Sequence, residues 1–264
     1  MLRVDQGDDG VCRITLDRPD ARNALTVEMR DELLSAIGAA RADDGVRSVL
    51  IRAEGPSFCT GMDLRASTVT RAGTPGFDPR TTSQALRVGV QAFITELWEL
   101  DKPTVVAVNG HAIGPGAHLA LACDFVFVSP LTKFGWSFDK IGLVADAGGA
   151  YLLPRLVGLP RAKAMILLGE GVAGADAVSL GLAYRCVDDD ALDAEADALA
   201  VRLASGPTRA LGLSKRLLNR SFETDLADSL ELEGHFQALA TASTDLVEGM
   251  AAFRDKRGAD FTGR

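Results

Sequence analysis

One stretch of this 264-residue chain, from Pro103 to Gly149, constrains its fold more than any other. It begins with β-branched and small apolar residues at 104–108 that predict a buried strand. A glycine-rich turn follows, and then an apolar segment, 117–123, that predicts a short helix. A strand that leads through such a turn into a helix presents unpaired backbone N–H groups at the helix N-terminus. The stretch therefore predicts an α/β fold with a site suited to developing negative charge.

About thirty residues further on, Asp146 is a lone carboxylate in a run of small apolar residues and glycines. An acid in such a setting, following a turn that can hold negative charge, suggests proton abstraction beside an oxyanion. The alternative is that Asp146 caps the helix predicted from residue 148, a role for which aspartate is well suited. The sequence leaves both interpretations open.

Charge and cysteine usage limit the class of protein. Acidic residues number 36 and basic residues 28, and this net charge of −8 argues against a general nucleic-acid binder. The four cysteines, at 12, 59, 123 and 186, are widely spaced and form no C-x-x-C pair, so we expect reduced thiols and no structural metal. The N-terminus resembles no signal peptide and no apolar run is long enough to span a membrane. We expect a soluble cytoplasmic protein.

Strand and helix patterns alternate up to about residue 190, and only helices are predicted beyond it. We therefore expect an α/β core at 1–190 and a helical region at 191–264, with helices at 191–204, 208–219 and 224–253. Within the core, residues 85–100 predict one amphipathic helix. Residues 65–84 predict a long loop that shapes the binding pocket.

Two competing motifs carry less weight. Residues 169–174 match G-x-G-x-x-G, but the dinucleotide interpretation requires a preceding strand, and 160–168 predict a helix that these glycines end. Ser57 or Cys59 could act as a nucleophile with His118, yet no G-x-S-x-G surrounds a serine and no basic residue flanks Cys59. His118 itself is interpreted either as a hydrogen-bonded core or pocket-edge residue or as a substrate-facing one.

Five motifs, in their order and spacing, resemble the crotonase (enoyl-CoA hydratase/isomerase) superfamily over essentially the whole chain. They are RPDARNAL at 18–25, FCTGMDL at 58–64, AVNG at 107–110, LALACD at 119–124 and FRDKRG at 253–258. The run at 138–155 is most similar to the branch that comprises ring-1,2-epoxyphenylacetyl-CoA isomerases and 3-enoyl-CoA isomerases. The resemblance implies a ββα-superhelix core, a C-terminal helical trimerisation region, and a homotrimer or dimer of trimers. It also implies an acyl-CoA thioester as substrate, with no cofactor or metal besides.

The resemblance also assigns residues. The family holds the thioester carbonyl with two backbone N–H groups, which fall here on Met62 and Pro115. Proline has no N–H, so Gly116 N–H or a side chain such as His118 would have to substitute. Hydratases of the family carry two glutamates that hold and activate water, and His118 and Phe138 occupy those positions. Asp146 falls where isomerases of the family carry their working aspartate.

These matches favour an enoyl-CoA isomerase in which Asp146 is the sole acid and base, taking the α-proton and returning it at the γ-carbon through an oxyanion-stabilised enolate. Its apolar setting predicts a raised pKa. An enoyl-CoA hydratase and a catalytically silent acyl-CoA-binding protein stay as alternatives, with hydrolysis a distant fourth. The resemblance places CoA contacts at Arg22, Ala24, Asp63, Leu64, Phe253 and Lys256, the last two in some relatives reaching a neighbouring subunit.

Overall fold

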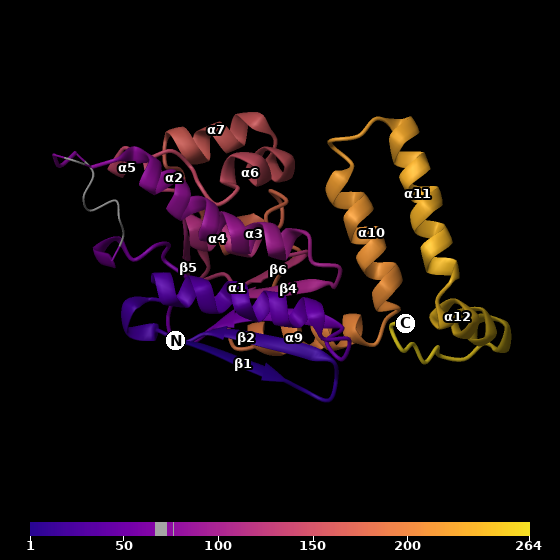
Figure 1. Ribbon diagram of the computed structural model, residues 1–264. Coiled ribbons are helices and arrows are strands. Elements are labelled where there is room, and N and C mark those ends of the chain that lie inside the picture. Colours follow the sequence, from indigo (N-terminus) through magenta and orange to yellow (C-terminus); the bar gives the residue numbers. More distant parts are fainter. Residues whose placement is uncertain (67–72, 76) are drawn as a thin grey trace.

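The computed structural model describes residues 1–66, 73–75 and 77–264, and its centre is a six-stranded sheet (Figure 1). The strands in spatial order are β1 (Leu2–Gln6), β2 (Val11–Leu16), β3 (Ser48–Ala53), β4 (Thr104–Val108), β6 (Phe125–Val128) and β9 (Arg185–Cys186). Only the β1–β2 hairpin is antiparallel. Strand β4 is buried along its whole length, as its run of β-branched residues predicts for a central parallel strand.

A second, three-stranded sheet lies beside the first. It consists of β5 (His111–Ile113), β7 (Lys133–Gly135) and β8 (Val172–Ala173). Strand β4 leads into β5 and then helix α4 (Pro115–Leu121), and β6 leads into β7 and then α5 (Phe138–Ile141). This repeated β–β–α order is the predicted superhelix, so the expected fold class is confirmed. The short strands β5 and β7 did not emerge from the sequence, because three residues carry too little periodicity.

Helices cover both faces of the large sheet. The helix α1 (Val27–Ala42) packs on α3 (Val90–Trp98), and its N-cap Thr26 accepts a hydrogen bond from Met29 N–H at 3.2 Å. On the other face, α9 (Leu192–Ala204) buries four small or apolar side chains against β3, β4 and β6. The remaining core helices are η1 (Pro19–Ala21), η2 (Leu64–Ala66), α2 (Pro79–Val88), α6 (Gly149–Val157), α7 (Leu159–Leu167) and α8 (Gly174–Ala177).

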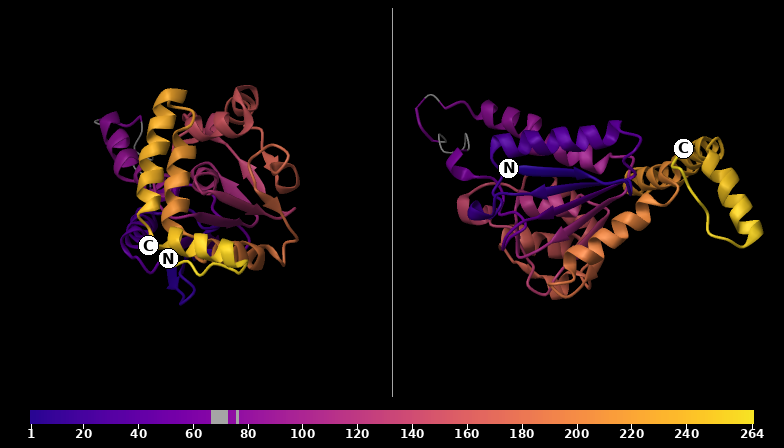
Figure 2. Two further views of the ribbon diagram at one scale, coloured as in Figure 1. Left: turned by 90° about the vertical axis from the view of Figure 1, so that its right-hand side faces the viewer. Right: turned by 90° about the horizontal axis from the view of Figure 1, so that it is seen from below.

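The last three helices, α10 (Thr208–Arg220), α11 (Leu226–Thr241) and α12 (Thr244–Asp255), form an arm that extends away from the core (Figure 2). Lys215 attaches α10 through Asp124, 3.0 Å from Nζ to Oδ2. The exposed apolar side chains of the arm include Leu218, Phe222, Leu226, Leu230, Leu239, Val247, Met250 and Phe253. Between Leu192 and Asp255 the structure has only helices and their connections, and the division into two domains at residue 190 stays a prediction.

Two predicted helices are wrong in their extent. The segment 224–253 is two helices, because α11 ends at Thr241 and Ser243 caps α12, its Oγ accepting from Leu246 N–H at 3.3 Å. The segment 85–100 is broken at Gly89, where an added Cβ would lie 2.6 Å from the Ala85 carbonyl oxygen and 2.8 Å from Arg30 Cδ. The break therefore falls where α1 leaves no room for a side chain.

The predicted loop at 65–84 is helical at its two ends, since η2 covers residues 64–66 and α2 begins at Pro79, capped by Asp78. Residues 67–72 and 76 lie outside the described residues. The glycines of the G-x-G-x-x-G match follow helix α7 rather than a strand, so their interpretation as a helix stop is confirmed. In the described residues no helix has the length and apolar character needed to cross a membrane.

Candidate active site

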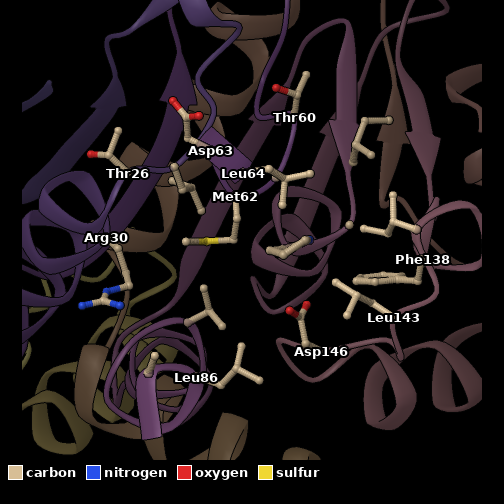
Figure 3. Close-up of a pocket in the computed structure, with 18 of the residues that line it drawn as sticks. Thr26, Arg30, Thr60, Met62, Asp63, Leu64, Leu86, Phe138, Leu143 and Asp146 are labelled. Carbon is tan, nitrogen blue, oxygen red and sulfur yellow. The ribbon is translucent and has the colours of Figure 1, made fainter. Parts of the chain in front are cut away.

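A largely apolar cavity of about 290 Å³ opens between the N-terminal part of α1, helices α2 and α3, and the N-terminus of α4 (Figure 3). Its apolar wall includes Leu25, Met62, Leu64, Leu86, Val90, Ile113, Pro115, Phe138, Ile141 and Leu143. Among the described residues, its charged side chains are Arg30, Asp63 and Asp146. Three of the predicted motifs, 18–25, 58–64 and 138–155, therefore meet at one cavity.

Two backbone turns form one wall of this cavity. Cys59 N–H donates to the His111 carbonyl at 3.0 Å, and the Cys59 carbonyl accepts from Ile113 N–H at 2.9 Å, so the segment 59–62 runs beside β5. Gly116 packs against the same residue, and a Cβ on Gly116 would lie 2.7 Å from Cys59 Cβ. The absence of a side chain at 116 thus lets the α4 N-terminus approach the 59–62 turn.

The backbone N–H of Met62 is available as a hydrogen-bond donor. Leu25 N–H donates to the Gly61 carbonyl, and the Leu25 carbonyl accepts from Asp63 N–H, so the Met62 N–H between them points away from Leu25. Among the described residues, nothing accepts a hydrogen bond from it. Pro115, the second predicted oxyanion residue, lines the cavity as the first residue of α4 but has no N–H. Gly116 N–H follows in the first turn of α4, where backbone donors lack intrahelical acceptors.

Asp146 lies in the segment between α5 and α6, and its carboxylate points into the cavity (Figure 3). Burial among apolar residues raises its pKa to about 6. Its buried Oδ1 has no hydrogen-bond partner among the described residues. The alternative role as a helix cap is wrong, since the N-cap of α6 is Gly148 and no side chain caps that helix. The Asp146 carboxylate is therefore free to meet a ligand.

The second carboxylate of the cavity is already engaged. Asp63 Oδ2 accepts from Arg18 Nη2 at 2.9 Å, and its Oδ1 accepts from Arg65 N–H at 3.2 Å. The Arg18 hydrogen bond is the largest effect on this group and lowers the pKa of Asp63 below its ordinary value. Asp63 thus stays ionised and bound, a poor proton carrier near neutral pH.

His118 lies behind the cavity wall. It is fully buried, does not line the cavity, and its ring stacks on Phe138 with centroids 5.9 Å apart. Its Nε2 accepts from Trp136 Nε1 at 3.0 Å. Burial lowers its pKa to about 4. Of the two residues at the positions of the family's glutamates, only Phe138 reaches the cavity, and the interpretation of His118 as a core histidine is the one that this geometry favours.

The nucleophile alternatives are outside the cavity as well. Ser57 and Cys59 are buried and neither lines it. Ser57 Oγ lies 3.5 Å from Nδ1 of His111, a different histidine from the one considered in the sequence. Burial raises the pKa of the Cys59 thiol to about 12, so it carries no thiolate near neutral pH.

The predicted CoA contacts fall into three groups. Asp63 and Leu64 line the cavity. Arg22 is exposed, and its carbonyl accepts from the N–H of Thr60, a residue that lines the cavity, at 3.2 Å. The Ala24 carbonyl accepts from Arg18 Nη1 at 2.8 Å. Phe253 lies in the last turn of α12 and Lys256 is the C-cap of that helix, and neither residue lines the cavity. In Figure 1, α12 lies on the arm, at the opposite end of the molecule from α2 and α5.

Two residues of the site escaped the sequence analysis. Arg30 brings a guanidinium to the cavity, where it pairs with Asp31 at 2.7 Å. Trp136 is buried and holds His118. The only signal for Trp136 is its place two residues before Phe138, because a buried Trp N–H needs an acceptor whose identity the sequence does not show.

Comparisons with known proteins agree with this geometry. The family described as enoyl-CoA hydratase/isomerase matches residues 6–264. The chain is 38% identical over 259 residues to the 1,2-epoxyphenylacetyl-CoA isomerase of Escherichia coli (strain K12), covering 97% of this chain and 96% of the relative. It is 36% identical over 256 residues to a probable enoyl-CoA hydratase of Rhodobacter capsulatus, with the same coverage.

Solved structures extend this similarity to the fold. A Mycobacterium abscessus protein assigned to the enoyl-CoA hydratases/isomerases has a TM-score of 0.93 at 38% identity, and the match covers all of both chains. An enoyl-CoA hydratase from Bacillus anthracis has a TM-score of 0.91 at 28% identity, covering 100% of this chain and 99% of that one. The similarity includes both isomerases and hydratases, so the choice between them depends on the site.

Proposed function

The chain belongs to the enoyl-CoA hydratase/isomerase (crotonase) family of enzymes, and from this premise we propose that it is an isomerase that moves the double bond of an enoyl-CoA thioester. The observation that carries the proposal is the state of Asp146. It is the one carboxylate of the described cavity wall without a hydrogen-bond or ion-pair partner at one of its oxygens, and its pKa is raised to about 6. Such a group can both take and return a proton near neutral pH.

The reaction needs a single proton carrier. Asp146 takes a proton from the α-carbon of a 3-enoyl thioester, and the electron pair moves onto the thioester oxygen to give a dienolate. Met62 N–H supports that oxygen, and Gly116 N–H is the donor of the adjacent turn that can take the place of Pro115. Asp146 then returns the proton at the γ-carbon, which leaves the double bond conjugated with the carbonyl. The apolar wall keeps water from the intermediate.

Hydration is the second candidate, supported by the similarity to hydratases. Adding water across a double bond requires groups that hold the water and move its proton. Phe138 presents an aromatic ring to the cavity, and His118 is buried behind it. Asp146 would have to perform the whole task alone, which favours isomerisation. The third candidate is a catalytically silent acyl-CoA-binding protein, which the missing N–H of Pro115 motivates. This hypothesis predicts that the thioester binds but is not turned over.

We further propose that Phe253 and Lys256 contact CoA only in the cavity of a neighbouring copy. The arm that carries both residues extends away from the core (Figure 2). Neither residue lines the cavity of its own chain, and the arm exposes several apolar side chains. A trimer in which arms are shared would satisfy both features. Arg22 and Ala24 are proposed to meet the CoA moiety at the cavity of their own chain.

The test is turnover of a 3-enoyl-CoA, followed through the absorbance of the conjugated 2-enoyl thioester, by the wild type and by Asp146→Asn. We expect kcat to fall at least 10²-fold in the variant while the thioester still binds by calorimetry. Asp176→Asn, an exposed aspartate on α8 outside the cavity, is the matched control and should turn over like the wild type. Wild-type protein that binds but does not turn over the thioester would support the silent binder, and formation of the 3-hydroxyacyl thioester the hydratase.

The same assay, repeated with a ring-1,2-epoxyphenylacetyl thioester, asks whether the cavity accepts a cyclic acyl group, the substrate type that the name of the Escherichia coli relative gives. Identifying the product formed from each of the two substrates would show whether the cavity accepts a cyclic acyl group, an open-chain acyl group or both. The apolar cavity of about 290 Å³ is compatible with either acyl group.

A further inference from the structure

His118 is enclosed on three sides by groups that leave its ring one orientation. Phe138 stacks on one face with an interplanar angle of 8°. Gly149 lies so close that a Cβ there would overlap the imidazole, with 2.9 Å to Nδ1 as the longest of the three distances. Trp136 donates from Nε1 to His118 Nε2 at 3.0 Å. The ring is therefore fixed by packing and by a hydrogen bond at the same time.

The Trp136 hydrogen bond also fixes where the imidazole carries its proton. An indole N–H can only donate, so Nε2 must present its lone pair. A neutral imidazole then carries its hydrogen on Nδ1, and burial keeps this ring neutral. The result is a buried N–H on α4 that lies beside Gly149, the first residue of α6.

Among the described residues, Nδ1 itself has no hydrogen-bond partner. The ring meets the turn that carries Asp146 through packing, because the Gly149 backbone lies against the imidazole and leaves no room for a Cβ. Gly149 N–H in turn donates to the Asp146 carbonyl at 2.9 Å, which joins this contact to Asp146.

The turn that carries Asp146 needs this support. Ala147 has φ of 47°, in the left-handed region that costs a residue with a side chain roughly 1–2 kcal/mol. A turn strained in this way keeps its shape only when its surroundings fix it. The His118 ring contacts Gly149 at the end of this turn. The Asp146 carboxylate points from the turn into the cavity (Figure 3).

We propose that Trp136 and His118 form a positioning pair that holds the turn at 146–149, and with it the Asp146 carboxylate, in place. This inference deepens the proposed function and rests on Asp146 being the proton carrier. His118 takes no proton during the reaction. It transmits the orientation set by Trp136 to the backbone of the residue that does.

The first measurement is independent of turnover. In ¹⁵N spectra of the three histidine side chains, His118 should show the Nδ1–H tautomer without titrating between pH 5 and 9. Trp136→Phe keeps the ring and removes the donor, and it should give a mixture of tautomers. A wild-type His118 that titrates in this range, or that carries its hydrogen on Nε2, would overturn the pair.

Kinetics then test the link to Asp146. We expect Trp136→Phe and His118→Leu to lower kcat about tenfold with KM nearly unchanged, and His118→Asn, whose amide oxygen can accept from Trp136 Nε1, to recover part of the loss. The acidic limb of the pH–rate profile should remain in all variants, because it belongs to Asp146. Its disappearance in His118→Asn would show that His118 itself titrates in the reaction. Wild-type kcat in both Trp136→Phe and His118→Leu would also contradict the proposal.

Two outcomes separate this inference from the proposed function. If Asp146→Asn keeps full turnover while the tautomer result holds, the proposed function fails and the pair remains as a structural fact. If Asp146→Asn is inactive while the tautomer result fails, the proposed function stands and the pair does not. Far-UV circular dichroism and the Tm of each variant identify any loss of folding, and Trp136→Phe is the milder of the two core changes.

Discussion

Asp63 and Asp146 line the same cavity, yet only Asp63 is bound by a guanidinium, with Arg18 Nη2 2.9 Å from its Oδ2. The pKa values of the two carboxylates move in opposite directions for this reason, lowered for Asp63 by Arg18 and raised for Asp146 by burial. One acid is held as an anion, and the other has the raised pKa that the proposed proton carrier requires. Carboxylates whose environments separate their pKa values in this way identify the acid and base of a site.

The rate should depend on pH through Asp146. The base must be ionised to take the α-proton, so kcat/KM should rise with pH up to about 6 and level off above it, falling roughly tenfold per unit well below that value. Measurements of kcat/KM from pH 4.5 to 8 with a substrate that does not titrate there would show this limb. A profile that is flat down to pH 4.5 would exclude a carboxylate with a raised pKa as the base.

Replacing Asp146 should stabilise the protein at neutral pH. Its folded pKa lies above its unfolded value, so between about pH 4 and 6 the folded state binds more protons than the unfolded state and stability falls as the pH rises. An uncharged Asn escapes this loss, and we expect Asp146→Asn to gain ~1–3 kcal/mol at pH 7. The gain should vanish near pH 4. Urea unfolding at both pH values measures it, and an equal gain at both would exclude this cause.

Pro115→Gly should increase turnover. Glycine restores an N–H at a residue that lines the cavity beside Met62, and one oxyanion donor is worth roughly 10²–10³ in kcat in other enzymes. Because Gly116 N–H is proposed to serve in part, we expect a smaller gain, roughly tenfold. Pro115→Ala offers the same N–H with less backbone freedom and should show the same direction. No gain in either variant would mean that another group already fills this role.

Gly116→Ala should lower both stability and turnover. The added methyl would lie 2.7 Å from Cys59 Cβ and collide with the Cys59 carbonyl, which joins the two turns of the cavity wall. We expect a loss of ~1–3 kcal/mol in urea unfolding, as for overpacked cores. Gly38→Ala is the control, since nothing lies within 4 Å of its added methyl in the middle of α1, and it should instead stabilise by ~0.5–1 kcal/mol.

The sequence predicted those features that depend on local patterns. The hairpin of β1 and β2, the cap at Thr26 and the buried strand β4 agree with the structure, because alternation, capping chemistry and β-branched runs are read over a few residues. The breaks at Gly89 and Ser243 were not predicted. Gly89 lies against Arg30 of another helix, a contact that no local pattern contains.

The site shows the same division. Motif order and spacing located Met62, Asp63, Pro115 and Asp146, all of which line the cavity. The family resemblance could not show that His118 lies behind Phe138. A matched position tells where a residue stands along the helix, but it does not tell which neighbouring side chains bury it. That burial depends on Trp136, whose hydrogen bond crosses from the β7–α5 connection to α4.

The arm formed by α10–α12 places Phe253 at 88% exposure and away from the cavity of its own chain. The proposed contact of Phe253 and Lys256 with a bound thioester would therefore have to be intermolecular. The fraction of occupied sites would then depend on two concentrations, that of the thioester and that of the protein itself. Dilution alone would weaken binding by releasing the residues that another chain contributes. A substitution at the tip of the arm could accordingly be rescued by mixing it with a chain that is defective only in its cavity.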